Sequence, residues 1–212
     1  MLNYTVLRNS DPFPKDKLAK RAFLLKAVED IKDTIRASGE KSEELSTLAP
    51  EAVKALRESG LFRLKLPAVL GGAEADPVTE MVVLEELAYH DFTSGWCTMV
   101  GGTSVASLGA FLPQSGIDKV FKEGRIPTGS ISFFPAGVAE KTEGGFNLKG
   151  RWRFNSGIGH AEWSVGAAVV DGTQNKEGPP QVIFCAIPKD DVTLHQNWDD
   201  VVGLKGTGSI DF

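Results

Sequence analysis

The sequence has few of the residues that build disulfide frameworks or metal sites. It contains two cysteines and three histidines among 212 residues. Cys97 and Cys185 lie far apart, each inside an apolar segment, which is typical of free cysteines buried in a core. Neither a Cys-x-x-Cys pair nor clustered histidines are present, so we predict no metal site. These features favour a reducing compartment, and we expect a cytoplasmic protein.

Clustered positive charge and long hydrophobic runs are also missing. The formal net charge is −5, and no basic run is interleaved with aromatic residues. Nucleic-acid binding needs clustered Lys and Arg, so this class of partner is excluded. The most apolar window, residues 96–112, is shorter than the roughly 20 residues that span a bilayer. We therefore predict no membrane partner.

The spacing of the apolar residues changes near residue 125. Before this point apolar residues recur every three or four positions, which predicts helices. The first helix is expected from Asp16 to Arg36. Signals for further helix starts stand at Pro50, Asp76-Pro77, Thr93 or Ser94, and Pro113. After it the apolar residues alternate, which predicts strands over 125–134, 138–143, 146–154, 163–170, 181–188 and 192–198. Gly144-Gly145 predicts a hairpin turn.

These patterns predict an α+β protein of two domains. We expect a flexible segment over 1–15, an all-α domain over 16–124 and a β-barrel- or sandwich-like domain over 125–212. The chain stops at Phe212, in what reads as the opening of a further strand. A β-domain cut there would keep an unpaired edge, so we expect an incomplete β-domain and a fragment.

One predicted strand carries a pattern that suits a flat ligand. Alternation would place Phe146, Leu148, Trp152, Phe154 and Ser156 on one face of residues 146–156. Aromatic rings and a hydroxyl on one face could support a heterocycle by stacking and by a directed hydrogen bond. The same face could equally be core packed against a neighbouring domain.

Five motifs follow one another in a distinctive order. They are LRESGLF (56–62) followed by Leu66-Pro67 and Gly71-Gly72, TSGWC (93–97), FPAG (134–137), the stretch 145–163, and GLKGTGS (203–209). The last lacks the order and context of a nucleotide phosphate loop. Together the five resemble the acyl-CoA dehydrogenase superfamily, in the branch that also contains two-component flavin monooxygenases. The resemblance implies a helical domain, a middle β-domain and a C-terminal four-helix domain, here absent, usually in a homotetramer.

The resemblance also implies a flavin site, with FAD as the cofactor and FMN as the alternative. Ser156 takes the place of a hydroxyl against flavin N5, and Phe154 that of a Trp packed on the ring. The strand that contacts the pyrimidine side matches Ser130, Ser132 and Phe133. On the substrate side the corresponding residues are Trp96, Thr103 and Ser104. The catalytic base stays unknown, because the family carries it in the absent C-terminal domain.

Three functions follow from this resemblance. The main expectation is an acyl-CoA dehydrogenase-type oxidoreductase that oxidises a C–C bond next to an acyl carbonyl, with hydride transfer to flavin N5. However, residues 133–139 lack the serine that helps such enzymes hold coenzyme A. The alternative is the oxygenase component of a two-component flavin monooxygenase, although its aromatic-hydroxylating members carry a His about where Thr103 and Ser104 lie. The third possibility is a truncated, non-catalytic fragment.

Partners follow from the same alternatives. The substrate would be an acyl-CoA or an aromatic or polycyclic small molecule, and the electron partner a flavin reductase or an electron-transfer flavoprotein. A full-length chain would form a homo-oligomer. For residues 1–212 alone we predict a colourless, inactive preparation, because pockets for such ligands bury about 70–90% of the ligand surface and one wall does not.

Overall fold

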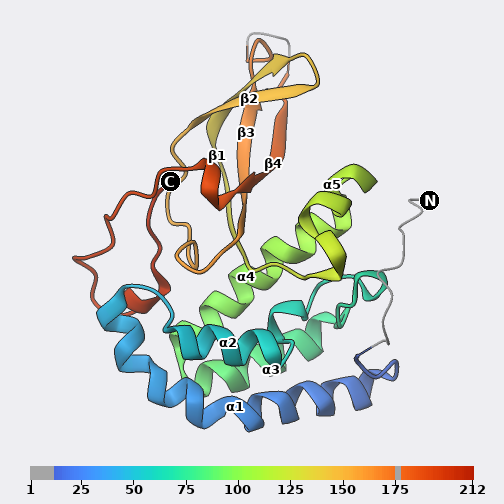
Figure 1. Ribbon diagram of the computed structural model, residues 1–212, viewed down its shortest axis with the longest axis vertical. Coiled ribbons are helices and arrows are strands. Elements are labelled where there is room, and N and C mark those ends of the chain that lie inside the picture. The colour runs from blue at the N-terminus through green and yellow to red at the C-terminus, as the bar shows by residue number, and fades with distance from the viewer. Residues whose placement is uncertain (1–11, 175–177) are drawn as a thin grey trace.

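The computed structural model describes residues 12–174 and 178–212. Most of the expected flexible segment, residues 1–11 of 1–15, therefore lies outside the described residues. The helices are α1 (Lys17–Leu45), α2 (Pro50–Glu58), α3 (Pro77–His90), α4 (Phe92–Phe111) and α5 (Gln114–Val120). The strands are β1 (Gly129–Thr142), β2 (Gly145–Gly150), β3 (Trp163–Val170) and β4 (Val182–Pro188). Helices precede a curled sheet, so the predicted fold class is confirmed (Figure 1).

Aspartate side chains fix the starts of three helices. Asp16 accepts a hydrogen bond from the N–H of Ala19, and Asp76 accepts one from the N–H of Thr79. Both starts agree with the sequence prediction, because an aspartate at this position satisfies a free amide of the first turn. The predicted cap of α4 at Thr93 or Ser94 is wrong. Asp91 caps this helix instead, accepting from the N–H of Ser94 at 2.7 Å.

The first helix runs well past its predicted end at Arg36, to Leu45. Its buried face there is formed by Ser38 and Ser42, whose hydroxyls donate to carbonyl oxygens one turn back at 2.7 Å and 2.9 Å. These bonds satisfy polar groups that would otherwise be costly to bury. A search for regularly spaced hydrophobic residues does not detect buried serines, and this explains why the predicted helix was too short.

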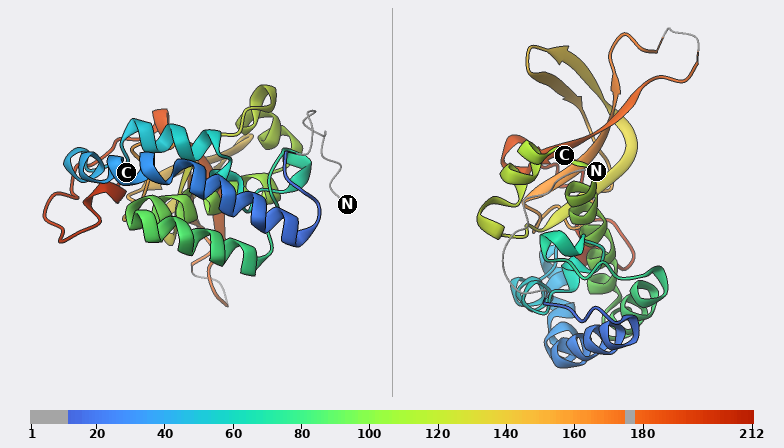
Figure 2. Two further views of the ribbon diagram at one scale, coloured as in Figure 1. Left: turned by 90° about the horizontal axis from the view of Figure 1, so that it is seen from below. Right: turned by 90° about the vertical axis from the view of Figure 1, so that its right-hand side faces the viewer.

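Helix α4 lies between the other long helices and the sheet (Figures 1 and 2). Val105 and Leu108 of α4 share a core with Ile131 of β1 and Val165 of β3. Small residues permit this close approach: a Cβ built at Gly129 would lie 2.5 Å from Ser104 Oγ. Because one core joins helix and sheet, the division into domains at residues 124 and 125 stays a prediction.

The sheet has the strand order β2-β1-β3-β4. β1 and β2 form the expected antiparallel hairpin at Gly144-Gly145, β1 and β3 are parallel, and β3 and β4 are antiparallel. β1 is one strand where two were predicted. Its register against β3 shifts between Ser132 and Gly137, and this irregularity accommodates Pro135 within the strand.

Two strand predictions are wrong in ways that matter for the site. β2 ends at Gly150, so Phe154 and Ser156 do not stand on one strand face with Phe146. The backbone of Trp152 pairs in both directions with Phe212, at 2.9 Å and 3.0 Å, and the two rings stack 5.2 Å apart. Residues 192–198 form no strand, only an isolated bridge between His195 and Asp211. No helix in the described ranges is long and apolar enough to cross a membrane.

Candidate functional site

Ser156 lies where three separate segments of the chain meet. Its hydroxyl oxygen accepts a hydrogen bond from the indole Nε1 of Trp96, on α4, at 3.0 Å. The same hydroxyl lies 2.7 Å from Ser209 Oγ, in the turn before the last residues of the chain. Ser156 is 5% exposed and Trp96 is 40% exposed. The predicted N5-facing hydroxyl is therefore held beneath an accessible indole ring.

Phe154 points its ring into a surface pocket. Its backbone has a φ of 57°, an unfavourable value for a bulky residue, and its ring is 68% exposed. The ring contacts Trp198 edge-to-face at 6.1 Å. A pocket of about 570 Å³ opens beside these rings and is also lined by Arg151, Arg153 and Ser209. This volume lies within the roughly 300–1,000 Å³ typical of small-molecule sites.

The three predicted residues of β1 have different environments. Ser130 is fully buried, and its hydroxyl bonds to the hydroxyl of Ser164 at 3.0 Å. Ser132 is 8% exposed and donates to the carbonyl oxygen of Arg153 at 3.4 Å, next to Phe154 in the chain. Phe133 is 60% exposed and contacts Phe184 edge-to-face at 5.9 Å.

Phe133 lines a second, apolar cavity between the C-terminal half of α4 and the sheet. Its volume is about 170 Å³, and its walls include Ser107, Phe111, Ile131 and Phe184. Eleven residues separate Trp96 from Ser107, which corresponds to about 16 Å along the helix axis. The structure thus brings Ser156 to Trp96 and Phe154 to Trp198, but Phe133 faces a different hollow.

The three expected substrate-side residues of α4 also have different environments. Trp96 contacts Ser156, as described. Thr103 accepts a hydrogen bond from Lys65 Nζ at 2.7 Å, and Lys65 also pairs with Glu80 at 2.6 Å. Ser104 is fully buried against Gly129, and its hydroxyl has no hydrogen-bond partner among the described residues. Of the three side chains, Trp96 is the one that reaches the Ser156 hydroxyl.

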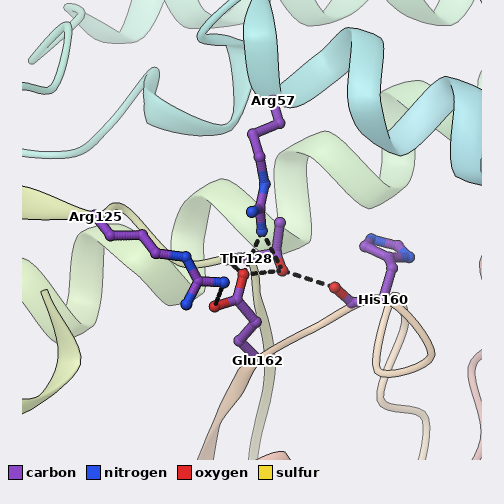
Figure 3. A network of polar contacts seen from close by, with 5 residues as sticks. All are labelled: Arg57, Arg125, Thr128, His160 and Glu162. Carbon is purple, nitrogen blue, oxygen red and sulfur yellow. Dashed lines mark hydrogen bonds and ion pairs between the residues drawn. The ribbon is translucent and has the colours of Figure 1, made fainter. Parts of the chain in front are cut away.

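An ionic network behind the site ties the helices to the sheet (Figure 3). Glu162, just before β3, pairs with Arg57 of α2 and with Arg125, the latter at 2.5 Å. Thr128 donates its hydroxyl hydrogen to the carbonyl oxygen of His160 at 2.7 Å. The network holds the start of β3 against α2, and this fixes the C-terminal side of the loop that carries Ser156.

The side chain of His160 is buried without a hydrogen-bond partner for either ring nitrogen within the described part of the chain. Burial, helped by the charges of Lys189 and Arg57, lowers the pKa of His160 to about 4. The imidazole is therefore neutral at pH 7. Its ring lies 6.1 Å from that of Phe62, so it acts as a packing group between η1 (Leu61–Arg63) and the Ser156 loop.

Sequence reasoning missed the residues that surround Ser156 from the end of the chain. Ser209 and Thr207 belong to the turn around η5 (Lys205–Thr207), whose Lys205 and Gly206 N–H groups donate to Glu43 of α1 at 3.0 Å and 2.9 Å. The signal was present as the motif at 203–209. This motif lacks the context of a phosphate loop, but its Ser209 contacts Ser156, and its Thr207 contacts Ser209.

Several known proteins resemble this chain over most of its length. Residues 19–112 match the family model described as acyl-CoA dehydrogenase, N-terminal domain. The oxygenase subunit HsaA of a flavin-dependent monooxygenase from Rhodococcus jostii is 33% identical over 177 residues, covering 83% of this chain and 45% of that protein. The oxygenase component of an FADH(2)-dependent resorcinol hydroxylase from a Rhizobium species is 30% identical over 188 residues, covering 88% of this chain and 44% of that protein.

Two solved structures also resemble this chain over most of its length. XiaF from a Streptomyces species, in complex with FADH2 and glycerol, superposes with a TM-score of 0.80 at 26% identity, covering 90% of this chain and 47% of that one. The HsaA monooxygenase from M. tuberculosis gives 0.79 at 30% identity, covering 90% and 51%. The chain thus spans about half the length of the curated relatives it matches.

Proposed function

Since the chain belongs to the acyl-CoA dehydrogenase superfamily, we propose that it works in the oxygenase component of a two-component flavin-dependent monooxygenase. The observation that carries the proposal is the set of relatives at about 30% identity: they are named as oxygenase subunits or components, and they align along both the helical and the sheet part of the chain.

The expected oxidation of a C–C bond next to an acyl carbonyl is wrong. The relatives are named monooxygenases and hydroxylases, which agrees with the alternative reading of the sequence. The unusual segment 133–139 fits this correction. This segment lacks the serine with which dehydrogenases hold coenzyme A, and it begins with two phenylalanines, Phe133 and Phe134, that are 60% and 76% exposed.

The residues around Phe154 suit a flavin nucleotide chemically. Phe154 and Trp198 offer aromatic surface for a flat ring, and Ser156 offers a hydroxyl for its polar edge. The pocket also holds Arg153, which has no ion pair among the described residues and could bind a phosphate. Arg151, in contrast, is paired with Asp211 at 2.9 Å. Reduced flavin, when bound, supplies the electrons for the reaction with dioxygen.

Each side chain then has one task. Ser156 would offer its hydroxyl to flavin N5, and Phe154 would pack on the ring. From β1, Ser132 would adjoin the flavin beside Phe154, whereas Phe133 faces the separate apolar cavity. Ser130 keeps β1 and β3 together through its bond to Ser164. Trp96 covers Ser156 and excludes water from it. Thr103 and Ser104 stay in the proposal as residues of the α4 wall on the substrate side.

The apolar cavity behind Phe133 could hold a small aromatic ring, but it lies about 16 Å along α4 from Trp96 and does not adjoin Ser156. Its volume of about 170 Å³ is close to the roughly 150 Å³ of an apolar cavity that binds benzene in another protein. Because one relative is named a resorcinol hydroxylase, we propose a small aromatic substrate. Reduced FAD, with FMN as the alternative, would come from a partner flavin reductase, and the assembled protein would be a homo-oligomer.

The proposal is tested by titrating the isotope-labelled chain with reduced FAD under anaerobic conditions and recording its amide and indole N–H signals. This method detects weak as well as tight binding. Signals of Trp96, Phe154 and Ser156 should shift, and an acyl-CoA should leave them unchanged. Shifts with the acyl-CoA and none with reduced FAD would overturn the proposal. A coupled assay with a flavin reductase and a panel of phenols then looks for hydroxylated products.

A further inference from the structure

Behind Ser156 lies an unbroken chain of four hydrogen bonds. Trp96 Nε1 lies 3.0 Å from Ser156 Oγ, and Ser156 Oγ lies 2.7 Å from Ser209 Oγ. Ser209 Oγ lies 2.8 Å from Thr207 Oγ1, which in turn lies 2.7 Å from the carbonyl oxygen of Leu204. The two ends have fixed roles, because an indole N–H can only donate and a carbonyl oxygen can only accept.

These fixed ends determine where each hydroxyl hydrogen lies. Thr207 must point its hydrogen at the carbonyl of Leu204, because a contact of 2.7 Å between two oxygens requires a hydrogen between them. Thr207 therefore accepts from Ser209. The single hydrogen of Ser209 is then used, so Ser209 accepts from Ser156. The hydrogen of Ser156 therefore points at Ser209 and is not available to a ligand.

Burial keeps this direction in place. Ser156 and Ser209 are each 5% exposed, and Thr207 is 2% exposed. Reversing one hydroxyl would leave a donor facing a donor or an acceptor facing an acceptor, and such a buried mismatch is costly. Ser156 keeps one lone pair after accepting from Trp96. It has no hydrogen left to give.

We infer that Ser209 and Thr207 fix the hydroxyl of Ser156 so that it can accept but not donate a hydrogen bond at a ligand, and that this direction is one source of the preference for reduced over oxidised flavin. N5 of reduced flavin carries a hydrogen, whereas N5 of oxidised flavin is an acceptor and would face the lone pair of Ser156. Ser209 and Thr207 are positioning residues, since they act on the ligand only through Ser156. The inference rests on the proposed function, which puts N5 at Ser156.

The first test uses variants that release the hydrogen of Ser156. Ser209→Ala removes its acceptor, and Thr207→Val removes the acceptor of Ser209, so that the chain of bonds can reverse. We expect the unmodified chain to bind reduced FAD about tenfold more tightly than oxidised FAD, and each variant to bring this ratio close to one, since one hydrogen bond changes affinity by about five- to tenfold. Ser209→Thr and Thr207→Ser keep the hydroxyls and should preserve the ratio.

The second test needs no variant. Oxidised 5-deaza-FAD carries a C–H group in place of N5, so it lacks the acceptor that would face Ser156. It should bind to the unmodified chain several-fold more tightly than oxidised FAD, as measured by shifts of the Trp96 indole signal.

The outcomes separate the inference from the proposed function. Equal binding of 5-deaza-FAD and oxidised FAD, or an unchanged ratio in folded Ser209→Ala and Thr207→Val chains, would overturn the inference alone. If reduced FAD leaves the Trp96 and Ser156 signals of the unmodified chain in place, the proposed function fails and the inference with it.

Discussion

Acidification should destabilise the folded chain through His160. Burial lowers the pKa of this imidazole to about 4, whereas an unfolded histidine titrates near 6.5. Between these two values the unfolded chain binds a proton that the folded chain does not, so the free energy of unfolding falls as the pH falls from about 6.5 to about 4. Below pH 4 both states are protonated, and this contribution no longer changes.

The two pKa values set the size of the effect. Lowering the pH from 7 to 5 should cost about 2 kcal/mol, and the full loss below pH 4 should be about 3 kcal/mol. The assay is urea unfolding at pH 7 and pH 5, for the unmodified chain and for His160→Leu. The leucine loses no hydrogen bond, because neither ring nitrogen has a partner among the described residues.

The comparison cancels the contribution of other titrating groups. Asp76, for example, has its pKa lowered by a hydrogen bond from Thr79 and by Lys17, and it keeps that behaviour in the variant. The unmodified chain should therefore lose about 2 kcal/mol more than His160→Leu between pH 7 and pH 5. Equal losses in the two proteins would refute the view that His160 is folded in its neutral form.

Three further predictions concern the walls of the site. Gly129→Ala should reduce the free energy of unfolding by about 1–3 kcal/mol, because its Cβ would lie 2.5 Å from Ser104 Oγ and 2.8 Å from Ser104 Cβ. Adding Ser104→Gly should restore part of this free energy, as measured by urea unfolding. If the effects of the two substitutions simply add, the contact is contradicted. Arg153→Gln should weaken the binding of reduced FAD roughly tenfold and leave the binding of reduced riboflavin, which has no phosphate, unchanged. Equal weakening of the binding of both ligands would exclude a phosphate contact. Ala186→Leu, which fills the apolar cavity, should weaken phenol binding at least about fivefold without changing the affinity for reduced FAD, as measured by titration of the labelled chain.

The sequence alone determined the features that depend on neighbouring residues. Asp16 and Asp76 mark the helix starts that they cap, and Gly144-Gly145 forms the hairpin turn. The change of hydrophobic period separated helices from strands correctly. These features follow from interactions three or four residues apart, which a short window of sequence contains. The family resemblance added Ser156 and Phe154, whose roles stay proposals.

Tertiary structure decided what depends on residues far apart in the chain. β2 ends at Gly150 because the next residues pair with the end of the chain, as Trp152 does with Phe212. The alternation that placed Phe154 and Ser156 on one strand face had no access to that pairing. Likewise, Ser156 meets Trp96 and Ser209 across 60 and 53 residues of sequence. The direction of a hydroxyl's hydrogen depends on every partner in the chain of bonds, and only the folded protein brings those partners together.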